Sequence, residues 1–308
     1  MNFLKLIRYP NLLLLALMQL LFKYGFLDLQ NITLAINDWQ YGLLVLSTVL
    51  IAAAGYVINN ILDQETDSSN KPQDVIVGKH ISEAAAYNIY ITLNCIGVTI
   101  GFYLANTIGK PNFSAIFIVI AATLYMYATT LKQMAVVGNI VVALLLAISV
   151  LIIGVFTLYP AITVANQPVM GSLFSVLLDY ALYAFMINFL RELVKDIEDM
   201  NGDYNQGMRT LPILLGQRRT QIIILALSII PIIVIAFYIK TNLLPARLYT
   251  TIAYSMIFIL APLFLFIVKI IGAKTTQDFH FLSRLLKWIL LFGILSILVL
   301  NLNIKYNA

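Results

Sequence analysis

The sequence predicts an all-α membrane protein, with about nine transmembrane helices in a single polytopic domain that covers residues 1–308. Composition is the first reason, because 61% of the residues are hydrophobic and only 11% are charged, whereas soluble domains have about 25% charged residues. The second is that apolar segments recur along the chain, each near the roughly 20 residues that a helix needs to cross the hydrocarbon core. The third is that no linker rich in proline, glycine or serine separates these segments.

The apolar segments are long enough to be helices and too long to be strands of a membrane barrel. The first follows Lys5 and Arg8 as a signal peptide would, but no small-residue cleavage site comes after it, so we expect it to be retained. Asn88 and Asn94 make the third segment less apolar, and Pro231 is expected to kink the seventh. The expected helices are about 10–27, 41–62, 82–105, 113–131, 136–158, 172–194, 219–240, 247–271 and 283–304.

The lysines and arginines predict the orientation of these helices. If the N-terminus is cytoplasmic, 14 of the 19 basic residues fall on the cytoplasmic side. Such an excess is typical of cytoplasmic loops. We therefore expect an integral, multi-pass protein with a cytoplasmic N-terminus, in the inner membrane of a prokaryotic cell.

Several other classes of site are not supported. The net charge of +5 comes from bases in short membrane-flanking loops, so it does not indicate nucleic-acid binding. Cys95 is the only cysteine, which excludes a disulfide framework and a cysteine metal site. His80 and His280 are far apart in the sequence and are interpreted as ordinary loop residues.

Acidic residues concentrate in two stretches, residues 59–79 and 191–216, which hold nine of the 14 acids of the chain. Asn59, Asp63 and Asp67 are spaced i, i+4 and i+8, so they stack on one face at the end of the second helix. Asp199 and Asp203 repeat this spacing at the end of the sixth helix, with Asp196 one turn earlier. Both stretches face the cytoplasm in the predicted topology, so they can meet at one site.

Ligands that offer only oxygen suit a hard cation, and Mg²⁺ usually binds one or two carboxylates together with substrate phosphates. A single D-x-x-x-D pair is no more than the polarity of an ordinary helix end. Two pairs on the same side, one of them extended by an asparagine, favour a magnesium site that holds a diphosphate. The predicted metal ligands are Asn59, Asp63, Asp67, Asp196, Asp199 and Asp203.

Basic residues accompany the acids on the same predicted side. Lys71, Lys132, Lys195 and Arg209 could contact phosphate oxygens, although positive-inside topology alone would also place bases there. Lys132 ends the fourth helix, close to a Gly138–Asn139 pair that could cap the fifth.

Glycine and proline after the sixth helix predict that residues 202–212 form a turn-rich loop and do not continue the helix. Most aromatic side chains are interpreted as interface belt or core, and a few could line a tunnel for an isoprenoid tail. The candidates for such a tunnel are Tyr56, Tyr125, Tyr127, Tyr180, Tyr183 and Phe185.

Taken together, these motifs resemble the UbiA superfamily of intramembrane prenyltransferases over nearly the whole chain. The pattern N-x-x-x-D-x-x-x-D is met at residues 59–67, and D-x-x-x-D followed by G-x-x-T-L-P at residues 199–212. Residues 131–139 resemble the L-K…G-N element of the family. Arg8 and Asn11 resemble its N-terminal R-P-x-N. The second motif looks most like the branch that contains digeranylgeranylglyceryl phosphate synthase.

The resemblance implies nine helices around a central cavity that opens near the cytoplasmic face. It implies a magnesium-bound polyprenyl diphosphate, a lipophilic acceptor, and transfer of the prenyl group between them. The catalytic residues carried over are Asp63, Asp67, Asp199 and Asp203. The substrate-binding residues are Asn59, Lys71, Lys132, Lys195, Arg209, Arg8 and Asn11.

Two departures from the family pattern bear on the acceptor. Asp74 stands where an arginine is expected in other branches, and Asn60 replaces a common aspartate. The best-matching acceptor is a lipid like geranylgeranylglyceryl phosphate, or an aromatic or quinone precursor. A membrane transporter and a non-catalytic prenyl-lipid-binding protein of the same fold stay open as alternatives.

Overall fold

The computed structural model of the chain describes residues 2–64 and 75–307, which form helices and no β-strand. The α-helices are α1 (Asn2–Leu6), α2 (Tyr9–Gly25), α3 (Asp38–Leu62), α5 (Glu83–Thr107), α6 (Ser114–Thr129), α7 (Val137–Thr157), α8 (Gln167–Asn205), α9 (Leu211–Leu215), α10 (Gln217–Tyr238), α11 (Tyr249–Ser255), α12 (Ala261–Gly272) and α13 (Thr276–Asn307). Short 3₁₀ turns are η1 (Leu27–Gln30), η3 (Pro111–Phe113), η4 (Leu131–Gln133) and η5 (Tyr159–Ala161), and two π-helical turns are η6 (Ile239–Leu243) and η7 (Met256–Leu260).

Nine helical segments in the described part of the chain are long and apolar enough to cross a membrane, which confirms the predicted number. Two of them, the sixth and the ninth, are longer than expected. The ninth begins at Thr276 and not near residue 283. Its start is capped by Asp278, whose carboxylate accepts hydrogen bonds from the N–H groups of Lys274 and Thr275 at 3.0 and 2.9 Å. Acceptors at this position stabilise the first turn of a helix.

The prediction of a turn-rich loop at residues 202–212 was wrong over its first part, because α8 continues as one helix to Asn205. Gly202 inside a helix costs only about 1 kcal/mol relative to alanine. Burial of Ile197, Gly202 and Asp203 in this last part of α8 offsets that cost. The chain turns at Gly207, which adopts a φ of 67° that favours glycine.

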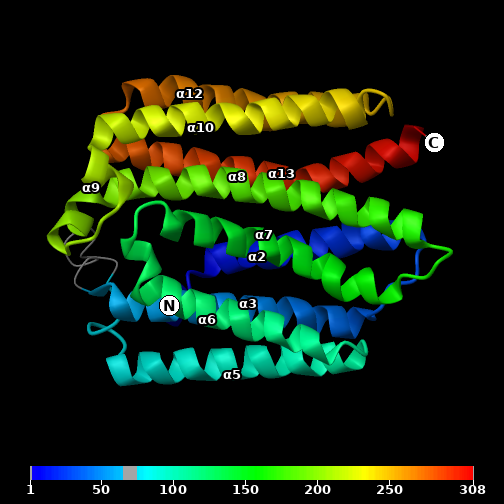
Figure 1. Cartoon of the computed structure of the whole chain (residues 1–308), viewed down its shortest axis with the longest axis horizontal. Helices are drawn as coiled ribbons and strands as arrows, with labels where there is room; N and C mark the ends of the chain where they lie inside the picture. The colour runs from blue at the N-terminus through cyan, green and yellow to red at the C-terminus, as the bar shows by residue number, and fades with distance from the viewer. Residues whose placement is uncertain (1, 65–74, 308) are drawn as a thin grey trace.

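The long helices lie side by side along the longest axis of the molecule, as Figure 1 shows. Helices α10 and α12 form one edge of the bundle and α5 forms the opposite edge, with α13, α8, α7 and α2 between them. A large buried cluster that includes Phe22, Tyr41 and Phe156 packs α2, α3 and α7 together. A second cluster, which includes Phe266 and Leu286, packs α12 and α13 against α8 and α10.

The described parts of the two acidic stretches lie at the same end of the bundle. The end of α3, the end of α8 and the short helix α9 all lie at the left in Figure 1. This follows from the number of crossings, because four membrane-spanning segments separate the end of α3 from the end of α8. The same end carries η4 and the start of α13, which adds basic residues to the acids.

Candidate functional site

A cavity of about 840 Å³ lies between the helices at this end of the bundle. Residues of α2, α3, α6, α7, α8 and α13 line it. One part of the lining is polar and charged, and the rest is apolar, with Leu15, Phe22, Phe117, Val150 and Leu290 among its residues. Such a cavity suits a ligand that has a charged head and an apolar tail.

The structure brings the described members of the two predicted acid columns to this one cavity. Asn59 and Asp63 line it from α3, and Asp196, Asp199 and Asp203 line it from α8. The side-chain amide of Asn59 donates to Asp63 Oδ2 at 2.6 Å. Its carbonyl oxygen Oδ1 is buried and accepts no hydrogen bond from the described residues. A buried oxygen without a partner is rare in folded proteins and is free to bind a cation.

Lys132 also reaches the acids, because its ammonium forms an ion pair with Asp63 Oδ1. Gly138 makes this approach possible. A Cβ atom at Gly138 would lie 2.8 Å from the carbonyl oxygen of Leu131 and 2.9 Å from the Cα atom of Lys132. Only glycine therefore allows η4 to pack this closely against the start of α7. This close packing places Lys132 beside the end of α3.

Asn139 has a different role from the helix cap that the sequence suggested. Helix α7 begins at Val137, so Asn139 already lies inside the helix. Its side-chain amide donates to Asp196 Oδ2 at 3.0 Å. The residue therefore orients an acid of the cavity, as residues behind metal ligands commonly do.

The electrostatics of the acids favour a bound cation. Burial, together with the repulsion of the nearby carboxylates of Asp199 and Asp63, raises the pKa of Asp203 to about 7. A divalent ion would relieve this repulsion. Among residues 2–64 and 75–307, no three histidine, cysteine or acidic side chains gather into a compact metal cluster. A site that uses few carboxylates and completes its ligands with phosphate fits the donors present.

Arg8 and Asn11 lie in the cavity lining, as expected from the N-terminal motif. Arg8 has a left-handed backbone conformation, with a φ of 49°, between α1 and α2. Its guanidinium lies over the ring of Tyr56, 5.5 Å from the centroid. Asn11 Nδ2 donates to Tyr56 Oη at 3.2 Å, and Asn11 Oδ1 accepts from Lys287 Nζ at 2.7 Å.

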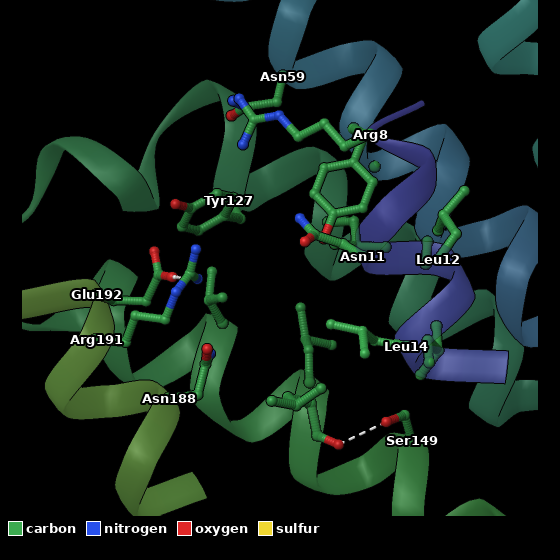
Figure 2. A pocket seen from close by; sticks show the side chains of 18 of the residues that line it. Arg8, Asn11, Leu12, Leu14, Asn59, Tyr127, Ser149, Asn188, Arg191 and Glu192 are labelled. Atoms are coloured by element: carbon green, nitrogen blue, oxygen red, sulfur yellow. Dashed lines mark hydrogen bonds and ion pairs between the residues drawn. The ribbon is translucent and has the colours of Figure 1, made fainter. Parts of the chain in front are cut away.

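A second group of cavity residues was missed by the sequence analysis. Glu192 accepts from Arg191 Nη1 at 3.0 Å and from Lys195 Nζ at 3.2 Å, and Figure 2 shows Arg191 and Glu192 close to Asn188. Asn188 and Glu192 extend the Asp196 column at helical spacing, which was a usable signal. Lys287, which also lines the cavity, was missed as well. Its signal was a lysine inside the ninth apolar segment, because charged residues inside membrane-spanning segments are rare without a function.

The structure does not place Arg209 in the cavity lining. Its backbone N–H donates to the carbonyl of Gln133 at 2.9 Å, in a short bridge between extended segments. Met208 and Thr210 on either side line the cavity, so alternation along an extended chain directs the exposed Arg209 side chain away from it.

Three other predicted residues, Asp67, Lys71 and Asp74, lie outside the described residues. Asn60 donates to the carbonyls of Leu6 and Tyr56 at 3.2 and 2.8 Å, which ties α3 to the end of α1. An aspartate could not donate these bonds, which explains the departure from the family pattern.

His280 was interpreted as a loop residue, and this was wrong. It lies in α13, and its Nδ1 is 2.9 Å from Glu198 Oε1. The early start of α13 is the reason, because it brings the first turns of this helix beside the end of α8.

Of the aromatic residues that were candidates for a tunnel, Tyr56, Tyr127, Tyr180 and Tyr183 line the cavity.

Known proteins that are similar to this chain carry one name. A relative from Korarchaeum cryptofilum, named digeranylgeranylglyceryl phosphate synthase, is 33% identical over 201 residues, 65% of this chain and 64% of the relative. The chain therefore spans less than two thirds of that relative's length. A protein of the same name from Sulfurisphaera tokodaii is 30% identical over 237 residues, 76% of this chain and 75% of the relative.

Solved structures agree on the fold. A UbiA homologue from Archaeoglobus fulgidus, bound to DMAPP and Mg²⁺, matches with a TM-score of 0.62. It is 17% identical, and the match covers 96% of this chain and 99% of that one. At this identity the likeness shows the fold alone. The model of the UbiA prenyltransferase family matches residues 20–291, so the chain belongs to this family.

Proposed function

We propose that this protein is a magnesium-dependent prenyltransferase, which moves a prenyl group from a polyprenyl diphosphate to a lipophilic acceptor within the membrane. One observation carries the proposal: acids of α3 and α8 and several bases line the same cavity, whose remaining walls are apolar. The charged part suits a diphosphate with its metal ion, and the apolar part suits an isoprenoid tail. We infer that residues 1–308 act as one domain.

The metal ligands we propose are Asn59, Asp63, Asp196, Asp199 and Asp203, which line the cavity, and Asp67 by its place in the motif. When bound, Mg²⁺ would supply charge neutralisation to the diphosphate. The unpartnered Oδ1 of Asn59 supports this ligand set.

Basic residues of the site would contact the diphosphate oxygens. Lys132 and Lys195 line the cavity beside the acids and are our candidates. Lys71 remains a prediction from its motif. The exposed side chain of Arg209 could contribute only after a rearrangement of residues 208–210.

In the proposed reaction, the bond between the allylic carbon and its diphosphate oxygen breaks, and the diphosphate leaves with the electron pair. A nucleophilic atom of the acceptor forms the new bond to that carbon and loses a proton. The apolar walls would exclude water, which would otherwise capture the carbocation. Tyr127 lines the cavity, and its ring could stabilise the carbocation.

For the acceptor, we propose a lipid of the geranylgeranylglyceryl phosphate type. The names of the relatives from K. cryptofilum and S. tokodaii support this choice. An aromatic or quinone precursor is the alternative. We further propose that the cavity opens toward the cytoplasm, with the N-terminus on the same side, in the inner membrane of a prokaryotic cell.

The test is turnover by purified protein with labelled geranylgeranyl or farnesyl diphosphate and each candidate acceptor. We expect Mg²⁺-dependent product that disappears on chelation. Asp63→Ala and Asp199→Ala should lower kcat by roughly 10²- to 10³-fold, because removal of a metal ligand forfeits several kcal/mol of charge stabilisation. Turnover that survives chelation, or full activity of both variants, would contradict the proposal. Tight diphosphate binding without product on any acceptor would indicate a non-catalytic member of the family.

A further inference from the structure

A group of cations in the cavity has no role in the mechanism above. Lys287 lies in α13 and Arg191 in α8, both inside membrane-spanning segments, and Arg8 joins them from the turn before α2. All three line the cavity together with Asn11 and Asn188. Figure 2 shows Arg8, Asn11, Asn188 and Arg191 around the same space.

The ion pairs of the cavity leave this group short of negative charge. Lys132 pairs with Asp63, whereas Arg191 and Lys195 share the single carboxylate of Glu192. Lys287 donates to the neutral amide oxygen of Asn11. Within residues 2–64 and 75–307, no carboxylate forms an ion pair with Lys287 or Arg8. The Nε atom of Arg191 is buried and has no acceptor among these residues.

Positive charges that lie close together without counter-charges destabilise the protein unless a bound anion neutralises them. Arg191 lies close enough to Lys287 for the two positive charges to repel each other. Arg8, Arg191 and Lys287 are half-buried, and charges inside a membrane usually face a partner or a substrate. The excess of positive charge therefore indicates an anion that occupies this part of the cavity.

This anion would be distinct from the diphosphate. Arg191 precedes Asp199 by eight residues on α8, which corresponds to about 12 Å along the helix axis. That separation leaves room for the reacting atoms between two anionic groups. Glu192 joins the two regions, because it holds Arg191 on one side and Lys195 on the other.

We propose that Arg8, Arg191 and Lys287, with Asn11 and Asn188, bind the anionic headgroup of the acceptor, and that this headgroup is a phosphate monoester. The proposal rests on the proposed function and specifies its acceptor. Three cations, of which only Arg191 has a carboxylate partner among residues 2–64 and 75–307, match a dianionic phosphate better than the single charge of a carboxylate. The two amides supply further donors for phosphate oxygens.

The test compares two acceptors that differ only in the phosphate: geranylgeranylglyceryl phosphate and its dephosphorylated alcohol. The variant is Lys287→Gln, which removes the charge and can still donate to Asn11. With the full chain and Mg²⁺, we expect the KM for the phosphorylated acceptor to rise about 10-fold or more, as loss of a charged hydrogen bond implies. The KM for geranylgeranyl diphosphate should change less than about twofold, and use of the alcohol should be unaffected.

Arg284→Gln is the matched control, because Arg284 lies on the same helix but is exposed and outside the cavity lining. It should leave both KM values unchanged. A rise in the KM for the diphosphate with no change for the acceptor would assign Lys287 to the diphosphate site and overturn the proposal. Equal losses on the phosphorylated acceptor and on the alcohol would do the same, because the charge would then not contact the headgroup.

A binding measurement separates this proposal from the proposed function. Calorimetry with geranylgeranylglyceryl phosphate alone requires no turnover. Weaker binding to Lys287→Gln than to the unmodified protein supports the headgroup site even if no product forms with any diphosphate. Equal binding to both proteins overturns the headgroup site even if the protein is an active prenyltransferase.

Discussion

At the scale of single residues, the acids of the cavity are oriented by neutral and basic partners. Asn139 holds Asp196, and Asn59 and Lys132 hold Asp63. Such partners matter because a metal ligand must present its oxygen in a fixed direction, and bonds from behind the ligand fix that direction.

The first prediction concerns Asn139. Asn139→Ala removes the hydrogen bond to Asp196 without removing an acid, so we expect the Mg²⁺ concentration for half-maximal activity to rise about 10- to 100-fold. Titration of activity with Mg²⁺ measures this shift. Asn94→Ala serves as control, because the side chain of Asn94 donates to the carbonyl of Tyr90 in its own helix and lies outside the cavity lining. An unchanged Mg²⁺ requirement would show that Asn139 does not support a metal ligand.

At the scale of helices, aromatic packing closes the apolar part of the cavity. Phe22 of α2 meets Tyr180 of α8 edge to face, with 5.1 Å between ring centroids. The hydroxyl of Tyr180 is 2.7 Å from Ser296 Oγ of α13. Three helices therefore meet at this point, and because both rings line the cavity we expect them to limit the length of a tail that fits.

The second prediction concerns this closure. Phe22→Ala should enlarge the apolar part and raise the ratio of kcat/KM for a longer prenyl diphosphate to that for a shorter one, by roughly 10-fold. Product analysis with both diphosphates together measures the ratio. Phe156→Ala is the control, since Phe156 is fully buried but outside the cavity lining. Both variants should lose stability, by about 3–5 kcal/mol. A ratio that moves equally in both would exclude a role for Phe22 in tail length.

Helices α10 and α12 lie at an edge of the bundle and contribute no residue to the cavity lining. Gln221 of α10 joins them, because its Nε2 atom donates to the carbonyls of Ile270 and Ala273 at 3.3 and 2.7 Å. These carbonyls lie at the end of α12, where the Ile270 carbonyl also accepts a long bond of 3.4 Å from the N–H of Ala273 and the Ala273 carbonyl lies beyond the last turn of the helix.

The third prediction follows from this contact. Gln221→Leu removes the side-chain donor of the buried Ala273 carbonyl and leaves the Ile270 carbonyl with the long bond of 3.4 Å from the N–H of Ala273, so we expect the free energy of unfolding to fall by about 1–3 kcal/mol, with kcat retained. Thermal unfolding in detergent, together with the turnover assay, measures both. Gln217→Leu is the control, because Gln217 makes a longer, exposed contact of 3.4 Å to the carbonyl of Lys274. Equal melting temperatures for the two variants would contradict this account.

At the scale of the whole molecule, the basic residues have two roles: they set the orientation in the membrane, and some of them line the cavity. Of the 14 bases counted on the cytoplasmic side, six line the cavity: Lys5, Arg8, Lys132, Arg191, Lys195 and Lys287. Part of the positive-inside signal is therefore a property of the site. The two roles agree, because a site for anionic substrates and the positive-inside rule place bases at the same end of the bundle.

The fourth prediction tests the orientation. In a Cys95→Ser background, which removes the only natural cysteine, Gln206→Cys and Val164→Cys place single exposed thiols at opposite ends of the bundle. A membrane-impermeant maleimide should label Val164→Cys in intact cells, and Gln206→Cys only after permeabilisation. The reverse pattern would place the acids on the outer side and contradict a cytoplasmic N-terminus.

The sequence by itself determined the number of helices and the meeting of the acids at one end. Both depend on local properties: the length of apolar segments, and the helical spacing of Asn59 with Asp63 and of Asp199 with Asp203. The number of crossings between them then places both pairs on one side of the membrane.

The tertiary structure alone decided which further side chains share the cavity. Lys287 reaches Asn11 across 276 positions of sequence, and Asn139 reaches Asp196 across 57. Arg209 turns away although its motif resembles that of the family. Such contacts depend on how helices rotate and pack against one another, and the spacing of residues within a single helix carries no information about the rotation of its neighbour.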